Sequence, residues 1–123
     1  MAGGFLVAFN RTRGRVIAGR VRVADTPWSR AVGLLGRSSM EAGEGLWIKP
    51  CPMIHTFFMR FAIDAVFLDK GLRVVGVREG LAPWRFSPWF HGAAGVLELA
   101  GGSLRGGALA GDELEMRGES HAG

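Results

Sequence analysis

The fold is decided by the stretch Ile54-His-Thr-Phe-Phe-Met-Arg-Phe-Ala-Ile-Asp-Ala-Val-Phe-Leu-Asp69. In an extended strand, Ile63, Ala65 and Phe67 point to one side and the alternate residues point to the other. Both sides are apolar apart from a single acid, which is typical of a strand that is covered on both faces. We therefore expect this stretch to run through the interior of a β-rich domain.

Short apolar runs, separated by turn residues, extend on both sides of this stretch. They predict strands at 5–9, 16–24, 46–48, 63–68, 72–78, 95–100 and 113–117, with 53–59 also prone to form a strand. Asp69-Lys-Gly71 has the length of a hairpin connection, in which Gly71 can adopt a positive φ. Residues 103–109 are expected to form a helical turn. Sequential hairpins predict a mainly β (α+β) fold, with an antiparallel, barrel-like or rolled sheet of about seven or eight short strands.

A single short helix is expected near 27–35. Thr26 is a good N-cap, and Pro27 suits the first helical position because its missing N–H has no partner there. The apolar residues that follow have helical spacing, and they are Trp28, Ala31, Val32 and Leu35. Gly36 then provides the stop signal.

Length and composition predict one domain over residues 1–117, followed by a frayed tail at 118–123. The chain has 123 residues, 48% of them hydrophobic, which favours a folded core over disorder. No apolar run approaches the roughly 20 residues that span a bilayer, so we expect no membrane partner. Cys51 has no second cysteine to pair with, and the apolar run at 5–9 is too short for a secretory signal. We therefore expect a cytoplasmic protein.

Basic residues are concentrated in the first third of the sequence. Residues 1–40 contain seven arginines and one acid, Asp25, within a chain whose net charge is +4. A surface formed by Arg11–Arg37 could bind nucleic acid through phosphate contacts. Arg20 and Arg22, however, alternate with valines as on the solvated face of a strand, and no nucleic-acid-binding motif is present. A nucleic-acid partner is therefore an alternative that we do not favour.

The central stretch resembles the main motif of the family called "domain of unknown function 192", in a subgroup with His-Thr before Phe-Phe-Met-Arg. Four other segments resemble that family in the same order: Arg30-Ala-Val-Gly-Leu-Leu-Gly-Arg37, Gly45-Leu-Trp-Ile48, Val96-Leu-Glu-Leu99 and Gly111-Asp112. The resemblance covers about residues 15–117 and implies a small β-rich domain without a defined activity. This chain has Leu99-Ala-Gly-Gly102 where the family usually has Leu-Pro-Ala-Gly.

Asp64 is the one acid within the predicted interior strand. A buried carboxyl group needs a partner or a proton, and Arg60, Arg30 and His55 are the candidate partners. One hypothesis gives Asp64 a structural role, in an ion pair or as an acceptor of backbone N–H groups at a bend. The other places Asp64 in a polar cluster at the mouth of a pocket, where it orients Arg60 or His55 toward a ligand.

His55 also suggests an enzymatic alternative. A histidine can act as a general base, and Thr56 or Cys51 would then be the nucleophile of a small hydrolase-like or thiol enzyme. Nothing in the spacing requires this chemistry, and a hydrogen-bonded structural histidine is the more common case. The histidines show no metal-ligand spacing, and no glycine array forms a phosphate loop, so we expect no metal and no cofactor.

A second candidate site is the loop Pro83-Trp-Arg-Phe-Ser-Pro-Trp-Phe-His91. Loops lie on surfaces, and exposed Trp84 and Trp89 together with Arg85 have the composition of binding hot spots. The alternative is a loop folded back onto the sheet, with its aromatic side chains as a minor core. Glu98 is expected to face solvent or to pair with an arginine of the basic third.

The leading functional hypothesis is a non-enzymatic binding or accessory module. Its expected surface combines the Trp/Arg loop with the polar cluster of His55, Thr56, Arg60, Asp64 and Arg30. The partner would be a small molecule or another protein, which the sequence does not identify.

Overall fold

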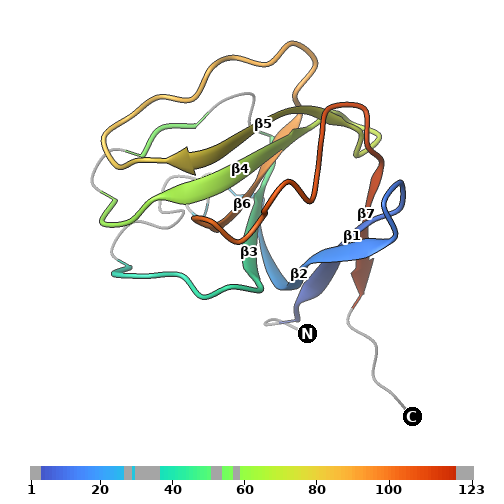
Figure 1. Cartoon of the computed structure of the whole chain (residues 1–123), viewed down its shortest axis with the longest axis horizontal. Helices are drawn as coiled ribbons and strands as arrows, with labels where there is room; N and C mark the ends of the chain where they lie inside the picture. The colour runs from blue at the N-terminus through green and yellow to red at the C-terminus, as the bar shows by residue number, and fades with distance from the viewer. Residues whose placement is uncertain (1–3, 27–28, 30–36, 51–53, 57–58, 119–123) are drawn as a thin grey trace.

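A computed structural model of the chain describes residues 4–26, 29, 37–50, 54–56 and 59–118. Its seven strands are β1 (Leu6–Asn10), β2 (Arg15–Ala24), β3 (Glu44–Ile48), β4 (Ile63–Leu68), β5 (Val74–Leu81), β6 (Gly95–Ala100) and β7 (Leu114–Gly118). They form one sheet in the order β5-β4-β6-β3-β2-β1-β7 (Figure 1). The pairing of β2 with β3 is parallel, and the other neighbours in the sheet are antiparallel. The prediction of a mainly antiparallel β fold is confirmed.

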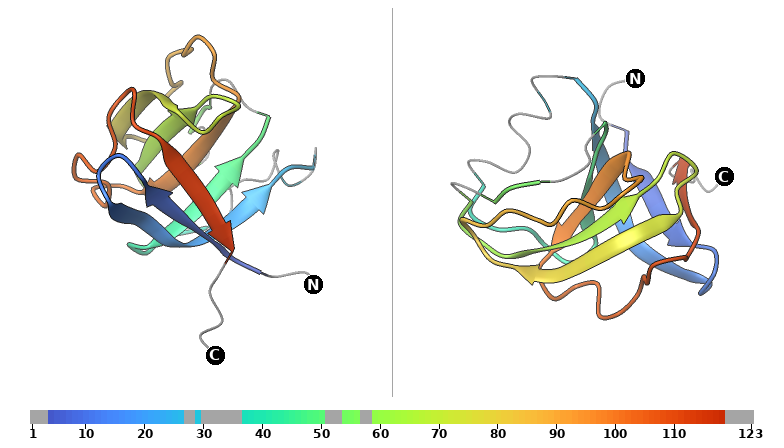
Figure 2. Two further views of the ribbon diagram at one scale, coloured as in Figure 1. Left: turned by 90° about the vertical axis from the view of Figure 1, so that its right-hand side faces the viewer. Right: turned by 90° about the horizontal axis from the view of Figure 1, so that it is seen from above.

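The sheet curls into a half-barrel, so that its two edge strands approach each other at one corner (Figure 2). Arg73, just before β5, forms an isolated bridge with Glu113, just before β7. Next to that bridge, Val74 N donates to Asp112 O at 2.8 Å and Leu114 N donates to Leu72 O at 2.9 Å. These bonds pair edge backbone groups that would otherwise be open to another chain.

Two apolar clusters cover the two faces of the sheet. The inner cluster, inside the curl, includes Trp47, Val66, Leu68, Leu97 and Leu99, with Leu6, Leu72 and Met116 packed against it. The outer cluster, on the opposite face, includes Leu46, Ile48, Ile63, Ala65, Phe67 and Val96. All six residues of β4 are buried, and its five apolar residues alternate between the two clusters. The prediction of a strand covered on both faces is therefore confirmed.

The order of strands differs from a simple series of hairpins. Only β1–β2 and β4–β5 are hairpins of consecutive strands. β6 lies between β4 and β3, and β7 pairs with β1. β6 can take a central place because all of its residues are buried, like those of β4.

Three local predictions were wrong in detail. In the connection after β4, Leu72 rather than Gly71 has the positive φ, at 65°. The Asp69 carboxyl Oδ1 accepts hydrogen bonds from Gly71 N and Arg73 N, both at 2.9 Å, and this Asx-type bonding sets the backbone path. Within 53–59, the described residues form only the isolated bridge of His55 with Phe86. Residues 103–109 form turns and bends instead of a helix.

The predicted helix at 27–35 lies outside the described residues apart from Ser29. At its expected start, Ser29 N donates to Thr26 Oγ1 and Thr26 N donates to Ser29 Oγ, both at 3.0 Å. This reciprocal pair is the pattern of a helix N-terminal cap at Thr26. In the described part of the chain, no helix is long and apolar enough to cross a membrane.

Candidate functional site

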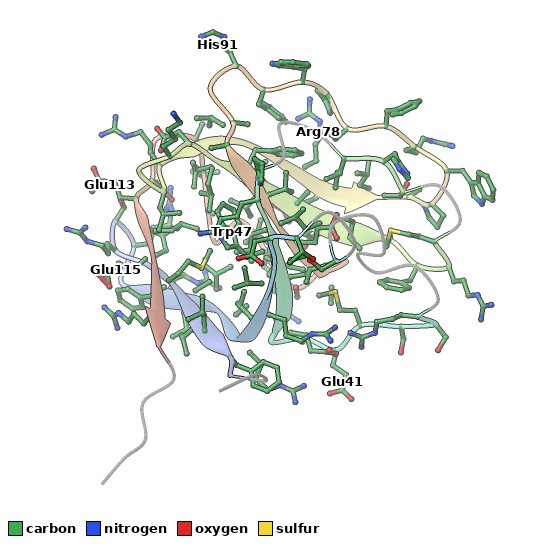
Figure 3. The ribbon with its side chains drawn as sticks, turned by 180° about the vertical axis from the view of Figure 1, so that it is seen from behind. Glu41, Trp47, Arg78, His91, Glu113 and Glu115 are labelled. Atoms are coloured by element: carbon green, nitrogen blue, oxygen red, sulfur yellow. The ribbon has the colours of Figure 1, made fainter. Side chains whose placement is uncertain are left out.

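The connection between β5 and β6, residues 82–94, runs along the outer rim of the molecule, with His91 at its outermost part (Figure 3). It contains the predicted Trp/Arg loop. We refer to residues 82–90 as the aromatic loop. Its backbone is held by hydrogen bonds, whereas three of its aromatic side chains are exposed to solvent.

Thr56 holds the backbone of the aromatic loop. Its side chain is fully buried, and its hydroxyl donates to Ala82 O at 2.6 Å and accepts from Arg85 N at 2.9 Å. Its backbone N–H donates to Arg85 O at 2.8 Å, and its carbonyl accepts from Trp84 N at 2.9 Å. Thr56 therefore fixes the loop backbone at three residues, Ala82, Trp84 and Arg85.

A second anchor lies at the far side of the loop. The Ser87 hydroxyl accepts from Ile54 N at 2.9 Å, while Ser87 N donates to Ile54 O at 2.8 Å. Phe90 then turns inward, with its ring centre 4.5 Å from that of Phe67. Gly76 leaves the space for Phe90, since a Cβ at that position would lie 2.1 Å from the ring.

The aromatic side chains between these anchors point outward. Trp84, Phe86 and Trp89 are 54%, 61% and 69% exposed. Trp84 has a φ of 63°, a conformation that a bulky side chain rarely adopts and that persists only where the surroundings enforce it. His55 lies edge-on to Phe86, with ring centres 6.4 Å apart. The alternative of a loop folded back as a minor core holds for Phe90 but not for these three side chains.

Three basic residues lie within the aromatic loop, on β5 or just before β4. Arg85 lies within the loop and Arg60 lies just before β4, and both are exposed. Arg78 is stacked over the Phe90 ring at 5.4 Å (Figure 3). The aromatic loop therefore presents exposed apolar rings together with the positive charge of Arg85.

Asp64 takes no part in this surface. Its side chain is fully buried, and its oxygens accept hydrogen bonds from Gly80 N at 2.8 Å, Gly102 N at 3.2 Å and Leu104 N at 2.9 Å. No hydrogen bond or ion pair joins it to His55 or Arg60, all three of which are described residues. This arrangement corresponds to the hypothesis of a carboxyl group that accepts backbone N–H groups.

The geometry does not favour Thr56 as a nucleophile, because its hydroxyl is buried and already bonded to the loop backbone. Arg30 and Cys51, the other residues of the predicted cluster and of the enzymatic alternative, lie outside the described residues. Among the residues that the structure describes, no group of three or more His, Cys, Asp or Glu side chains could hold a metal ion.

Glu98 is the residue whose environment the sequence analysis missed. It is 4% exposed, so the expectation that it faces solvent was wrong. Its register partners are Leu46 and Ala65, which places its side chain on the outer apolar face of the sheet. Within the described part of the chain, no ion pair or hydrogen bond reaches its carboxyl group, and burial raises its pKa to about 8. The signal available in the sequence was the unbroken run of apolar neighbours on both sides.

The arginines of the basic third are largely paired with acids. Ion pairs join Arg11 to Glu115, Arg13 to Asp112, Arg20 to Glu41 and Arg37 to Glu44. Two of these four acids, Asp112 and Glu115, lie about 100 residues away in the chain, so the sequence could not show their pairing. A phosphate backbone would have to compete with these carboxylates, which does not favour the nucleic-acid alternative.

The fold and these residues define a small β domain of a family without a known function. The chain belongs to the DUF192 family ("Uncharacterized ACR"), whose model matches residues 8–116. It is 35% identical over 112 residues to a UPF0127 protein of Thermococcus sibiricus, covering 86% of this chain and 71% of that protein. It is also 42% identical over 72 residues to a UPF0127 protein of Pyrococcus horikoshii, covering 54% of this chain and 60% of that one. The resemblance inferred from the sequence is confirmed.

Two solved structures have a similar fold. A protein of unknown function from Novosphingobium aromaticivorans superimposes with a TM-score of 0.76 and 27% identity, over 89% of this chain and 83% of that one. A putative transcription regulator from Sinorhizobium meliloti superimposes with a TM-score of 0.74, over 94% and 98% of the two chains. The latter is 23% identical, and its similarity shows the fold alone. No enzymatic function is indicated by these relatives.

Proposed function

We propose that this protein is a non-enzymatic binding module that engages another protein through the aromatic loop. The observation that carries the proposal is the contrast between a fixed backbone and three aromatic side chains that are more than half exposed. Exposed tryptophan beside arginine is the composition of interface hot spots. A loop that is already ordered loses little conformational entropy when a partner binds.

The partner should offer apolar pockets for Trp84, Phe86 and Trp89 with an acidic group beside them, because Arg85 lies between Trp84 and Phe86 in the loop and is exposed. His55 supports Phe86 from the side and belongs to the same surface. In this proposal Thr56 and Asp64 act by holding the backbone and do not touch the partner. The proposal places the protein in the cytoplasm, which the single cysteine favours.

The experiment combines chemical cross-linking in the native cell with binding measurements on the purified partner. Trp89→Ala should weaken the complex by about tenfold or more, since central aromatic anchors dominate interface energies. Leu109→Ala is the matched control, because Leu109 is also exposed, at 51%, but lies outside the loop. It should leave the affinity within about twofold.

Acrylamide quenching of tryptophan fluorescence provides a second readout. In protein that carries Trp28→Phe, the indoles of Trp84 and Trp89 should be quenched in the free state and protected in the complex, while the buried Trp47 should be little quenched in either state. Equal affinity of the Trp89→Ala and wild-type proteins, with no protection on binding, would show that the partner uses another face.

A further inference from the structure

The inside of the curled sheet is hollow at one end. A cavity of about 580 Å³ lies there, between the ends of β2 and β3, the start of β1, the connection from β4 to β5, and β7. Pockets for small molecules commonly have volumes of about 300–1,000 Å³ and often lie at the mouths of β-barrels. This cavity shares none of its lining residues with the aromatic loop.

The walls of the cavity are apolar. Its larger apolar side chains, which come from four strands and one connection, are Leu6, Val23, Trp47, Leu72 and Met116, with Pro50 and Ala94 beside them. Val23 and Trp47 are register partners on β2 and β3, so they lie side by side on the inner face. Val23 is 39% exposed although it is on the inner face, because it borders the cavity instead of packed side chains. Trp47 lies near the middle of the molecule, where its indole covers Gly95 (Figure 3).

Two lysines, Lys49 and Lys70, lie at the rim of this apolar cavity. Both are exposed, and in the part of the chain that the structure describes no ion pair or hydrogen bond engages either ammonium group. The acids at the rim are already in use: Asp69 accepts the backbone N–H groups of Gly71 and Arg73, and Asp25 has a partner in the fold. The rim therefore offers a ligand the two ammonium groups as hydrogen-bond donors, while the Asp69 carboxylate is directed to the backbone of its own turn.

We propose that this cavity binds a small amphipathic carboxylate, with its acyl chain against the apolar walls and its anionic head group between Lys49 and Lys70. The apolar walls exclude a fully polar ligand, because burying polar groups without partners is unfavourable. The two lysines select an anionic over a neutral or cationic head group, since charge-assisted hydrogen bonds are the stronger kind. This site is separate from the aromatic loop, so carboxylate binding in the cavity and protein binding by the loop can be tested independently.

The test is isothermal titration of the purified protein with dodecanoate below its micelle concentration. Dodecanoate should bind one to one, and dodecan-1-ol, which has the same chain without the charge, should bind about tenfold more weakly. Butyrate, which has the charge without the long chain, should show no measurable binding. Failure of dodecanoate to bind, or equal affinity for the alcohol, would overturn the proposal.

Variants locate the ligand within the cavity. The double variant Lys49→Gln, Lys70→Gln should lower the affinity for dodecanoate about tenfold, and Val23→Trp should lower it at least as much by filling the cavity. Arg22→Gln is the matched control, because Arg22 is exposed and adjacent in sequence but does not line the cavity, and its affinity should stay within about twofold.

Wild-type affinity in folded Val23→Trp protein, as judged by circular dichroism, would overturn the cavity as the site. Trp89→Ala should bind dodecanoate like the wild type. A loss in Trp89→Ala equal to that in Val23→Trp would place the ligand on the aromatic loop and would also overturn the proposal.

Discussion

Two buried acids on neighbouring strands, Asp64 on β4 and Glu98 on β6, occupy opposite kinds of surroundings. Asp64 faces a bend where the backbone N–H groups of Gly80, Gly102 and Leu104 converge on it. Glu98 projects one register position away, on the outer apolar face, beside Leu46 and Ala65. Both side chains are removed from solvent to nearly the same extent.

The difference shows that burial alone does not decide what a carboxyl group does to a fold. Around Asp64, irregular backbone supplies three N–H donors, and the buried one, of Leu104, would be unsatisfied without the carboxyl group. Around Glu98, regular strands direct their N–H groups to neighbouring strands, so none is left for the side chain. An acid at a bend can therefore stabilise the structure, whereas burial of an acid in mid-sheet raises its pKa and favours its neutral form.

The largest effect is expected from Asp64→Ala. It should lower the free energy of unfolding by about 4 kcal/mol, because the buried N–H group of Leu104 and the part-buried N–H groups of Gly80 and Gly102 lose their acceptor. Urea denaturation at neutral pH measures the change. Asp64→Asn keeps one acceptor oxygen and should lose about half as much. Wild-type stability in both variants would contradict the structural role and remove the contrast with Glu98.

A smaller effect, with a dependence on pH, is expected at Glu98. Its pKa is about 8 in the folded protein against an ordinary 4.5, so the folded state binds a proton that the unfolded state has released between these values. The stability of the wild type should therefore fall as the pH rises from 4.5 to 8. At about 1.4 kcal/mol for each pKa unit, the ceiling is about 5 kcal/mol, and relaxation of the site should reduce it to about 3 kcal/mol.

The variant Glu98→Gln tests this directly, because an amide cannot ionise. It should lose the fall in stability over this pH range and be more stable than the wild type at the alkaline end. Glu41→Gln is the control, since the Glu41 side chain is 79% exposed and its removal should leave the pH profile unchanged. Parallel pH profiles of thermal unfolding in wild-type and Glu98→Gln proteins would contradict the raised pKa.

The smallest effect is expected at a third acid, Asp112, with the opposite sign. Burial by itself raises its pKa, but hydrogen bonds from Asn10, Leu109 and Arg13 outweigh burial and hold the pKa below its ordinary value of 3.8. The stability that ionised Asp112 contributes is therefore present above its ordinary pKa and is lost as the pH falls through its lower folded-state pKa. Asp112→Asn should reduce the loss of stability in acid by about 1 kcal/mol, as measured by urea unfolding at neutral and acidic pH. An undiminished loss in the variant would show that Asp112 behaves like an exposed acid.

Predictions that depended on apolar alternation and composition succeeded, and those that depended on particular hydrogen bonds failed or were incomplete. β4 was predicted within its observed bounds because apolar residues on both sides of a strand leave no other stable placement. The prediction placed the positive φ at Gly71, but the structure has it at Leu72. The hydrogen bonds of Asp69 with the turn backbone outweigh the intrinsic preference of glycine for this conformation. The aromatic loop was recognised by composition, but the exposure of its rings depends on Thr56, which is 29 residues from Arg85 in the chain.

Alternation, turn residues and local composition were enough to predict the β-rich class, the buried central strand, the family resemblance and the Trp/Arg loop. The folded structure was needed to show that β6 lies between β3 and β4, that Asp64 meets backbone N–H groups from two distant segments, and that a cavity opens beside Val23 and Trp47. These features join residues far apart in the chain. Such contacts form only when the sheet curls, and local propensities carry no information about which distant segments the curl will bring together.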